Sequence, residues 1–314
     1  MADFFNNLWN WLAEPFNSLY AGSLIRNAFW ELLIISVIGG VVGTYIVLRG
    51  LVFIVDALTH AIFPGVVIAF LIGANFFLGA FISALAVALV IALVARNRRV
   101  SEDSSIGVIF TGAFALGVVL LSSQRSYGRS LEGFLFGDIL GITTLDLWVT
   151  GIVGLLILGA IFLFRKELLF SAFDAVMARA AGLPVVRLDL FLYLLIAATV
   201  VVSLPAVGNI LVLAFLVTPS ATARLFTNRF YLMMPIAVVI GMLSSLVGIY
   251  LGYYANVAGS AGVVVVATGF FIIGLLVSPH SGLFVRVRQW RQWRNQLRRA
   301  SQNGLEKPQP EGRA

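Results

Sequence analysis

The sequence predicts an all-α, polytopic integral membrane protein with eight or nine membrane-spanning helices. Three observations predict this fold class. Hydrophobic residues make up 60% of the chain and charged residues only 11%, and the mean hydropathy is +1.00. Apolar segments of roughly 20 residues, the length that crosses a bilayer as a helix, follow one another along the chain. The gaps between them are too short for a large soluble domain.

Apolar length and polar breaks define nine predicted spans, at residues 26–48, 51–72, 76–95, 104–122, 145–164, 188–207, 208–226, 231–254 and 258–277. Pro205, Gly208 and Asn209 mark the turn between the sixth and seventh spans, because Pro and Gly interrupt a regular helix. The apolar piece at 131–140 is too short to cross, so we expect a re-entrant or interfacial helix there. Glycines 39, 40 and 43 predict that the first span packs closely against a neighbouring helix.

The basic residues predict the orientation, since Lys and Arg concentrate in cytoplasmic loops. With nine spans and a cytoplasmic C-terminus, all but three of the 21 Lys and Arg lie on the inner side. The exceptions are Arg26, Arg125 and Arg129. The N-terminus is then outside the cell. This distribution also accounts for the net charge of +7 without a nucleic-acid partner.

Two segments flank the predicted membrane domain at 26–280. Residues 1–25 carry apolar side chains at helical spacing, which predicts an amphipathic helix lying in the outer lipid interface. Residues 281–314 form a basic tail in which Trp290 and Trp293 stand among arginines. The tail is expected either to anchor on the membrane surface or to contact a cytoplasmic partner.

The second span carries two ionisable residues within its apolar run, Asp56 and His60. Residues four apart share one face of a helix. Each such group costs roughly 2.5–3.5 kcal/mol at the membrane centre, so it usually faces a cavity, a partner helix or an ion. Pro64 lacks the N–H that would bond the His60 carbonyl, which predicts a kink and a free oxygen beside the imidazole. Carboxylate, imidazole and carbonyl together suit a divalent transition metal.

Other readings of this pair remain open, including an uncharged Asp–His hydrogen bond that closes a helix contact. The chain has no cysteine, which excludes thiolate ligands. It also has no phosphate-binding loop of the form G-x-x-x-x-G-K-S/T. We therefore expect a transporter subunit without resident cofactors, and not an enzyme that hydrolyses ATP itself.

The longest inner loop, at 164–187, predicts a short helix outside the membrane. Asp174 is a typical N-cap residue, and the alanine-rich segment after it favours helix. Gly182 predicts the C-terminal cap, and Pro184 follows it. This helix is either an interfacial connector or a surface on which another protein acts.

Four further residues are weaker candidates for a path or gate. Glu102 and Asp103 lie at the start of the fourth span, where acids are also stabilised simply by the helix dipole. Thr218 and Pro219 interrupt the seventh span, since Pro219 leaves the Phe215 carbonyl without its donor. That break is either pore-lining or a packed kink.

The chain resembles the permease subunits of the manganese, zinc and iron ABC importers, the ABC-3 family. The similarity rests on motifs spread over most of residues 35–280. They are LRGLVFIVDALTHAIFPGV at 48–66, SEDSSIG at 101–107, LFGDIL at 135–140, GNILVLAFLVTPSATA at 208–223 and ARAAGLP at 178–184.

The resemblance implies a homodimeric permease in a bacterial cell membrane. Two copies would bring two Asp56 and two His60 to a shared axis, with Gly65 allowing the second copy to approach closely. The transported metal would be manganese in preference to zinc or iron. Outside, a metal-binding lipoprotein would deliver it. Inside, a separate ATP-binding subunit would dock on the coupling segment, which comprises Ala178, Gly182, Leu183 and Pro184.

Two alternatives belong to other classes of transporter. One is a stand-alone secondary carrier or channel, in which Asp56 and His60 form a proton relay. The short helix in the 164–187 loop argues against it, because such a carrier needs no docking helix. The other is an importer of siderophores or cobalamin, which would need a wide cavity without two ligating Asp–His pairs.

Overall fold

The computed structural model describes residues 14, 22–94, 101–122, 137–255 and 258–278. The described part of the chain is helical, with no strand, so the predicted fold class is confirmed. The predicted N-terminal amphipathic helix and the basic tail lie outside the described residues. So does most of the expected re-entrant helix at 131–140, of which only the last residues and the 3-10 turn Ile139–Gly141 are described.

Eight spans in the described residues are long and apolar enough to cross a membrane, and the apolar part of a ninth helix, Leu211–Phe226, is shorter. Each corresponds to one predicted span. The helices are α2 (Gly22–Arg49), α3 (Val52–Ala61), α4 (Phe63–Leu71), α5 (Phe76–Val94), α6 (Glu102–Ser122), α8 (Thr144–Leu163), α9 (Arg165–Phe173), α10 (Ala175–Ala180), α11 (Val185–Val207), α12 (Asn209–Phe226), α13 (Phe230–Ala255) and α14 (Gly259–Val277).

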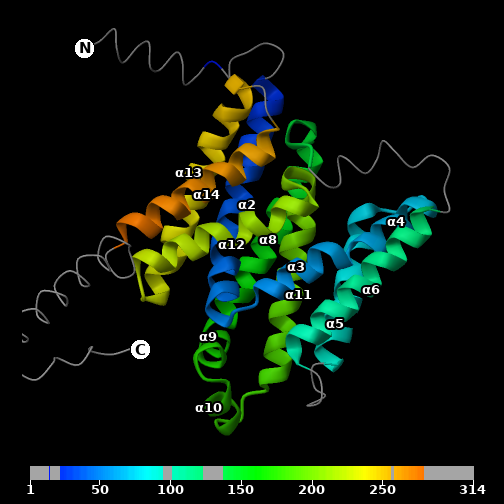
Figure 1. Cartoon of the computed structure of the whole chain (residues 1–314), viewed down its shortest axis with the longest axis vertical. Coiled ribbons are helices and arrows are strands. Elements are labelled where there is room, and N and C mark those ends of the chain that lie inside the picture. Colours follow the sequence, from blue (N-terminus) through cyan, green and yellow to red (C-terminus); the bar gives the residue numbers. More distant parts are fainter. Residues whose placement is uncertain (1–13, 15–21, 95–100, 123–136, 256–257, 279–314) are drawn as a thin grey trace, which may run out of the picture.

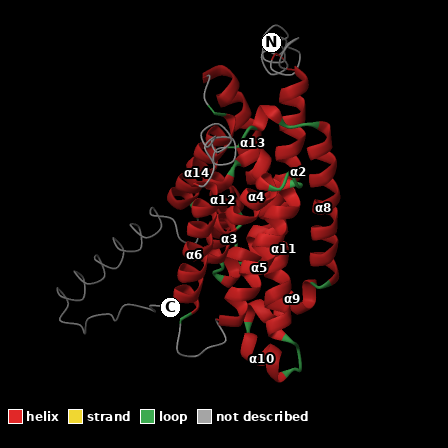
Figure 2. Ribbon diagram, turned by 90° about the vertical axis from the view of Figure 1, so that its right-hand side faces the viewer, coloured by secondary structure: helices red, strands yellow, loops and turns green. Residues whose placement is uncertain are grey.

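Helix α2 is the centre of the larger group of helices, where it contacts α8, α11, α12 and α13. Helices α4, α5 and α6 form a second group at the right of Figure 1. Helices α3 and α11 contact both groups and join them. The short helices α9 and α10 extend from one end of the molecule (Figures 1 and 2).

Close packing against α2 depends on its glycines, as predicted. A Cβ added at Gly40 would lie 2.7 Å from the backbone nitrogen of Val238 on α13. One added at Gly43 would collide with the Leu216 carbonyl oxygen on α12. Lipid tails are as apolar as the side chains, so helices in a membrane associate mainly through such close contacts.

The predicted kink at Pro64 is a one-residue break at Ile62, which separates α3 from α4 within a single apolar span. Helix α3 ends at Ala61, and Pro64 lies in the first turn of α4, where its missing N–H costs nothing. The Ser83 hydroxyl on α5 donates to the Ala61 carbonyl at 2.6 Å. A neighbouring helix thus satisfies an acceptor at the break.

The expectation that Gly65 admits a second copy of the chain was wrong. A Cβ at Gly65 would collide with the Gly79 carbonyl oxygen of α5 in the same chain. The close approach that this glycine permits is therefore between α4 and α5. Sequence spacing indicates that a helix comes close, but not which helix.

The turn between α11 and α12 also lies where it was predicted. Helix α11 ends at Val207, and Gly208 adopts a left-handed φ of 79°. The Asp138 N–H donates to the Pro205 carbonyl at 3.0 Å. A segment from the α6–α8 connection thus caps the end of α11.

The α2 packing generates a stability prediction. Replacing Gly40 by Val should lower the free energy of unfolding by about 1–3 kcal/mol, the usual cost of overpacking, because the Val238 backbone cannot move aside cheaply. Thermal unfolding of the detergent-solubilised protein measures this. Gly159→Ala is the matched control, since an added Cβ there meets nothing within 4 Å. Equal unfolding temperatures for Gly40→Val and the native protein would contradict the packing described.

Candidate functional site

Asp56 and His60 lie on one face of α3, as their spacing predicted. His60 Nε2 is 3.8 Å from Asp56 Oδ1, and the two side chains are 33% and 40% exposed respectively. A separation of 3.8 Å is too long for a hydrogen bond. The two groups are therefore close enough to act on one ion, yet they do not satisfy each other.

The His60 ring packs against two aromatic side chains of α6, which sequence reasoning did not identify. Phe110 is stacked on it at 5.9 Å between ring centroids, and Phe114 meets it edge-on at 5.5 Å. Phe114 also contacts Phe63, beside the helix break. The i, i+4 spacing of the two phenylalanines was visible in the sequence, but only the packing of α6 on α3 brings them to the imidazole.

One copy of the chain supplies few metal ligands. No group of three or more His, Cys, Asp or Glu side chains gathers in a metal-binding arrangement among the described residues. The α3 pair offers one carboxylate and one imidazole, the donor types that manganese, ferrous iron and zinc accept. A complete coordination shell requires ligands from elsewhere.

The acidic candidates Glu102 and Asp103 lie at the N-terminal end of α6. Helix α6 begins at Glu102, and the Asp103 side chain is exposed. The Ser104 N–H donates to the Ser101 hydroxyl at 3.1 Å, so Ser101 caps this helix. Asp103 precedes Phe110 by seven residues, or about 10 Å along the axis. Its position fits the dipole-stabilising role at least as well as a role in the path.

Thr218 and Pro219 lie within α12, which contacts α3. Pro219 is buried, and the Thr222 hydroxyl donates to the Thr218 carbonyl at 2.7 Å. The helix continues through the proline to Phe226. This arrangement is a packed proline within a continuous helix, and it lacks the helix interruption seen just before Pro64.

The short helix predicted outside the membrane is α10. Asp174 caps it by accepting hydrogen bonds from the Val176 and Met177 amides at 2.9 and 2.8 Å. At the other end, Gly182 has a φ of +84° and its N–H bonds the Arg179 carbonyl, while the Leu183 N–H bonds the Ala178 carbonyl, both at 3.0 Å. These two bonds form a Schellman cap.

The exposed surface of this segment differs from the one expected. Ala178 was predicted on it, but its side chain is fully buried. Gly182 and Pro184 are exposed and Leu183 is half-buried. Instead, three large apolar side chains point outward: Phe173, Val176 and Met177, which are 68%, 71% and 60% exposed. We call these three residues the α10 patch.

A bundle of apolar helices with a broken span and an ionisable pair beside the break defines an integral membrane transport protein. The ABC 3 transport family matches residues 22–278, and the chain belongs to this family.

Relatives extend over most of the chain. The "Manganese transport system membrane protein MntC" of Halalkalibacterium halodurans is 44% identical over 276 residues, covering 88% of this chain and 94% of that protein. The "Probable iron transport system membrane protein" of Haemophilus influenzae is 34% identical over 271 residues, covering 86% and 98%. Among solved structures, "PsaBC from Streptococcus pneumoniae in complex with Fab" has a TM-score of 0.77 and 33% identity, covering 86% of this chain and 96% of that one.

The cap of α10 can be tested without reference to function. Asp174→Ala should destabilise α10 by about 1 kcal/mol, because two amides lose their acceptor. Hydrogen exchange at Val176 and Met177 should then become several-fold faster. Asp174→Asn retains the acceptor and is the control. Unchanged exchange in Asp174→Ala would show that the cap does not hold the helix.

Proposed function

We propose that this protein is the membrane permease subunit of an ABC importer and that it carries a divalent transition metal, manganese in preference to zinc or ferrous iron. The observation that carries the proposal is the Asp56–His60 pair on one face of α3, next to the helix break. The 44% identical relative named for manganese transport supports that metal. The 34% identical relative named for iron transport makes ferrous iron the second candidate.

The ion itself explains how the α3 pair tolerates the membrane. An isolated carboxylate within a span is costly, whereas a divalent cation beside it compensates the charge. The open faces of Asp56 and His60, each a third or more exposed, leave room for such an ion. The rings of Phe110 and Phe114 restrict the imidazole on the other side.

A homodimer would complete the ligand set. Two copies related by a two-fold axis, the commonest symmetry of homo-oligomers, would contribute two carboxylates and two imidazoles. The shortage of ligands in one copy supports this arrangement. In it, the exposed face of α3 looks toward the other copy, while Gly65 is already occupied by α5.

The energy would come from a separate ATP-binding subunit that docks on the α10 patch. Three apolar side chains that point away from the membrane bundle fit a partner surface better than they fit water. The α9–α11 region also carries Arg165, Lys166, Arg179 and Arg187, which supports a cytoplasmic position. The N-terminus would then be outside the bacterial cell membrane and the C-terminus inside, with an extracellular metal-binding lipoprotein supplying the cargo.

A stand-alone carrier with an Asp56–His60 proton relay is the weaker alternative. A relay favours a hydrogen bond between the two groups, and their separation is 3.8 Å. Such a carrier also has no use for an exposed apolar patch on a short helix outside the bundle.

The first functional prediction concerns the metal. Asp56→Ala and His60→Ala should each reduce manganese uptake by about tenfold or more, since loss of even an outer-shell partner commonly costs 10–100-fold. Uptake of radiolabelled manganese into proteoliposomes that contain the assembled importer measures this. Asp146→Asn, at the far end of α8, is the control and should transport normally. Normal uptake in both α3 variants would remove this pair from the metal path.

The second functional prediction concerns docking. Met177→Glu should weaken binding of the ATP-binding subunit by about fivefold or more, because it places a charge in an apolar contact. Met177→Leu keeps the surface apolar and should bind normally. Co-purification at several salt concentrations reads out the affinity. If Met177→Glu binds as tightly as the native chain, the α10 patch is not the docking surface.

A further inference from the structure

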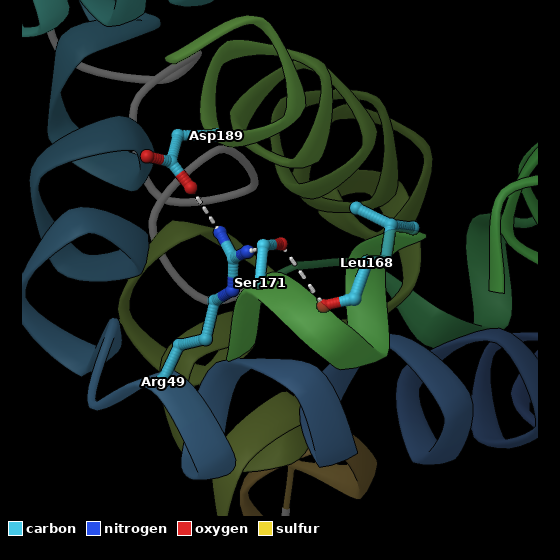
Figure 3. Close-up of polar contacts among 4 residues, drawn as sticks. All are labelled: Arg49, Leu168, Ser171 and Asp189. Carbon is cyan, nitrogen blue, oxygen red and sulfur yellow. Dashed lines mark hydrogen bonds and ion pairs between the residues drawn. The ribbon is translucent and has the colours of Figure 1, made fainter. Parts of the chain in front are cut away.

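A polar junction lies between the α10 segment and the helix that carries the α3 pair. Arg49 is the last residue of α2, and its guanidinium donates to Asp189 of α11 through Nη1 and to Ser171 of α9 through Nη2 (Figure 3). The Arg49 side chain is only 8% exposed and Asp189 is 35% exposed. The Ser171 hydroxyl in turn donates to the Leu168 carbonyl at 3.2 Å. One side chain thus joins three helices.

Arg49 bonds residues that flank α10 in the sequence on both sides. Ser171 lies three residues before the cap residue Asp174, and Asp189 is in the second turn of α11, which follows α10. The segment between them contains the α10 patch. A force applied to α10 from outside the bundle therefore reaches the Arg49 guanidinium from either direction along the chain.

The other side of the junction leads directly to the α3 pair. Gly50 adopts a left-handed φ of 68°, the Leu51 N–H bonds the Ile46 carbonyl at 2.9 Å, and α3 begins at Val52. Asp56 is then only about 6 Å along α3 at 1.5 Å per residue. Because this turn is tight and hydrogen-bonded, a movement of Arg49 is transmitted to Asp56 with little loss.

Some buried polar atoms at and near the junction make no hydrogen bond. Arg49 Nε and one carboxylate oxygen of Glu167 are buried without a hydrogen-bond partner among the described residues. Glu167 lies one turn before Ser171 on α9, so it presents a second carboxylate on that side of the helix. An unpaired buried donor is costly, so the present arrangement at Arg49 is not fully satisfied and has less hydrogen bonding to lose when α9 moves.

We propose that Arg49 is a positioning residue that couples movement of the α9–α10 segment to α3, and so links ATP hydrolysis by the docked subunit to release of metal from Asp56 and His60. The proposal rests on the proposed function. Arg49 does not touch the metal. It acts by holding the start of α3 to the two elements that flank α10.

The experiment uses the complete importer, the permease with its ATP-binding subunit, in proteoliposomes. ATP hydrolysis and manganese uptake are measured in the same preparation for Asp189→Asn and Arg49→Gln, and for two rescue variants, Arg49→Lys and the swapped pair Arg49→Asp with Asp189→Arg. We expect the two single variants to hydrolyse ATP while manganese uptake per ATP falls by about fivefold or more, the lower end of common coupling effects. The KM for manganese should stay within about twofold. The swapped pair and Arg49→Lys should recover part of the loss.

A junction that only stabilises the fold gives a different result. Hydrolysis and uptake then fall together with the amount of folded protein, and their ratio is unchanged, which overturns the proposal. If the two single variants do not fold, Ser171→Ala removes one bond at lower cost, and the same two outcomes apply. A native importer without ATP-dependent manganese uptake would overturn the proposed function itself. Normal native uptake with unchanged ratios in the variants overturns only the coupling role.

Discussion

The constraint on which the rest of the structure depends is the absence of water around the backbone inside a membrane. A helix satisfies its own N–H and C=O groups there, and any interruption needs partners from neighbouring protein. Two of the interruptions that the structure describes meet this condition through a donor from a neighbouring segment. At the α3–α4 break the Ser83 hydroxyl bonds the Ala61 carbonyl. At the α11–α12 turn the Asp138 N–H bonds the Pro205 carbonyl. Breaks of this kind allow a span to change direction, and the first of them lies beside the α3 pair.

Helix α2 organises the bundle because small residues let other helices come close to it. The contacts at Gly40 and Gly43 fix α12 and α13 against its backbone. A buried polar contact supplements them, since the Ser36 hydroxyl is 3.0 Å from the Ser245 hydroxyl on α13. With α12 and α13 fixed against it in this way, α2 holds a defined position, and α3 follows its C-terminal end at Arg49. That end is also where Arg49 makes its junction.

The candidate site combines an incomplete ligand set with a defined environment. Asp56 and His60 are held on a short helix, and Phe110 and Phe114 limit the imidazole from one side only. Their other side is exposed, as the metal passage proposed above requires. The α10 patch exposes its apolar side chains at one end of the molecule, where α10 lies (Figure 1). The described contacts therefore link the proposed docking surface, the polar junction at Arg49 and the candidate metal pair through the C-terminal end of α2.

Much of this organisation followed from the sequence. The apolar segments, the shared face of Asp56 and His60, the break at Pro64, the turn at Gly208 and the Asp174 cap all depend on neighbours a few residues away. Local rules of periodicity and backbone bonding act over that distance, so the chain by itself determined them.

Only the tertiary structure decided which faces meet. Within a membrane, a side chain that faces lipid and one that faces another helix are equally apolar, so composition does not distinguish them. For this reason Gly65 was assigned to a second copy although α5 occupies its face, and Ala178 was assigned to a docking surface although it is buried. The Arg49 contacts join residues 122 and 140 positions apart. No local pattern encodes them, because the partners meet only when α2, α9 and α11 pack together.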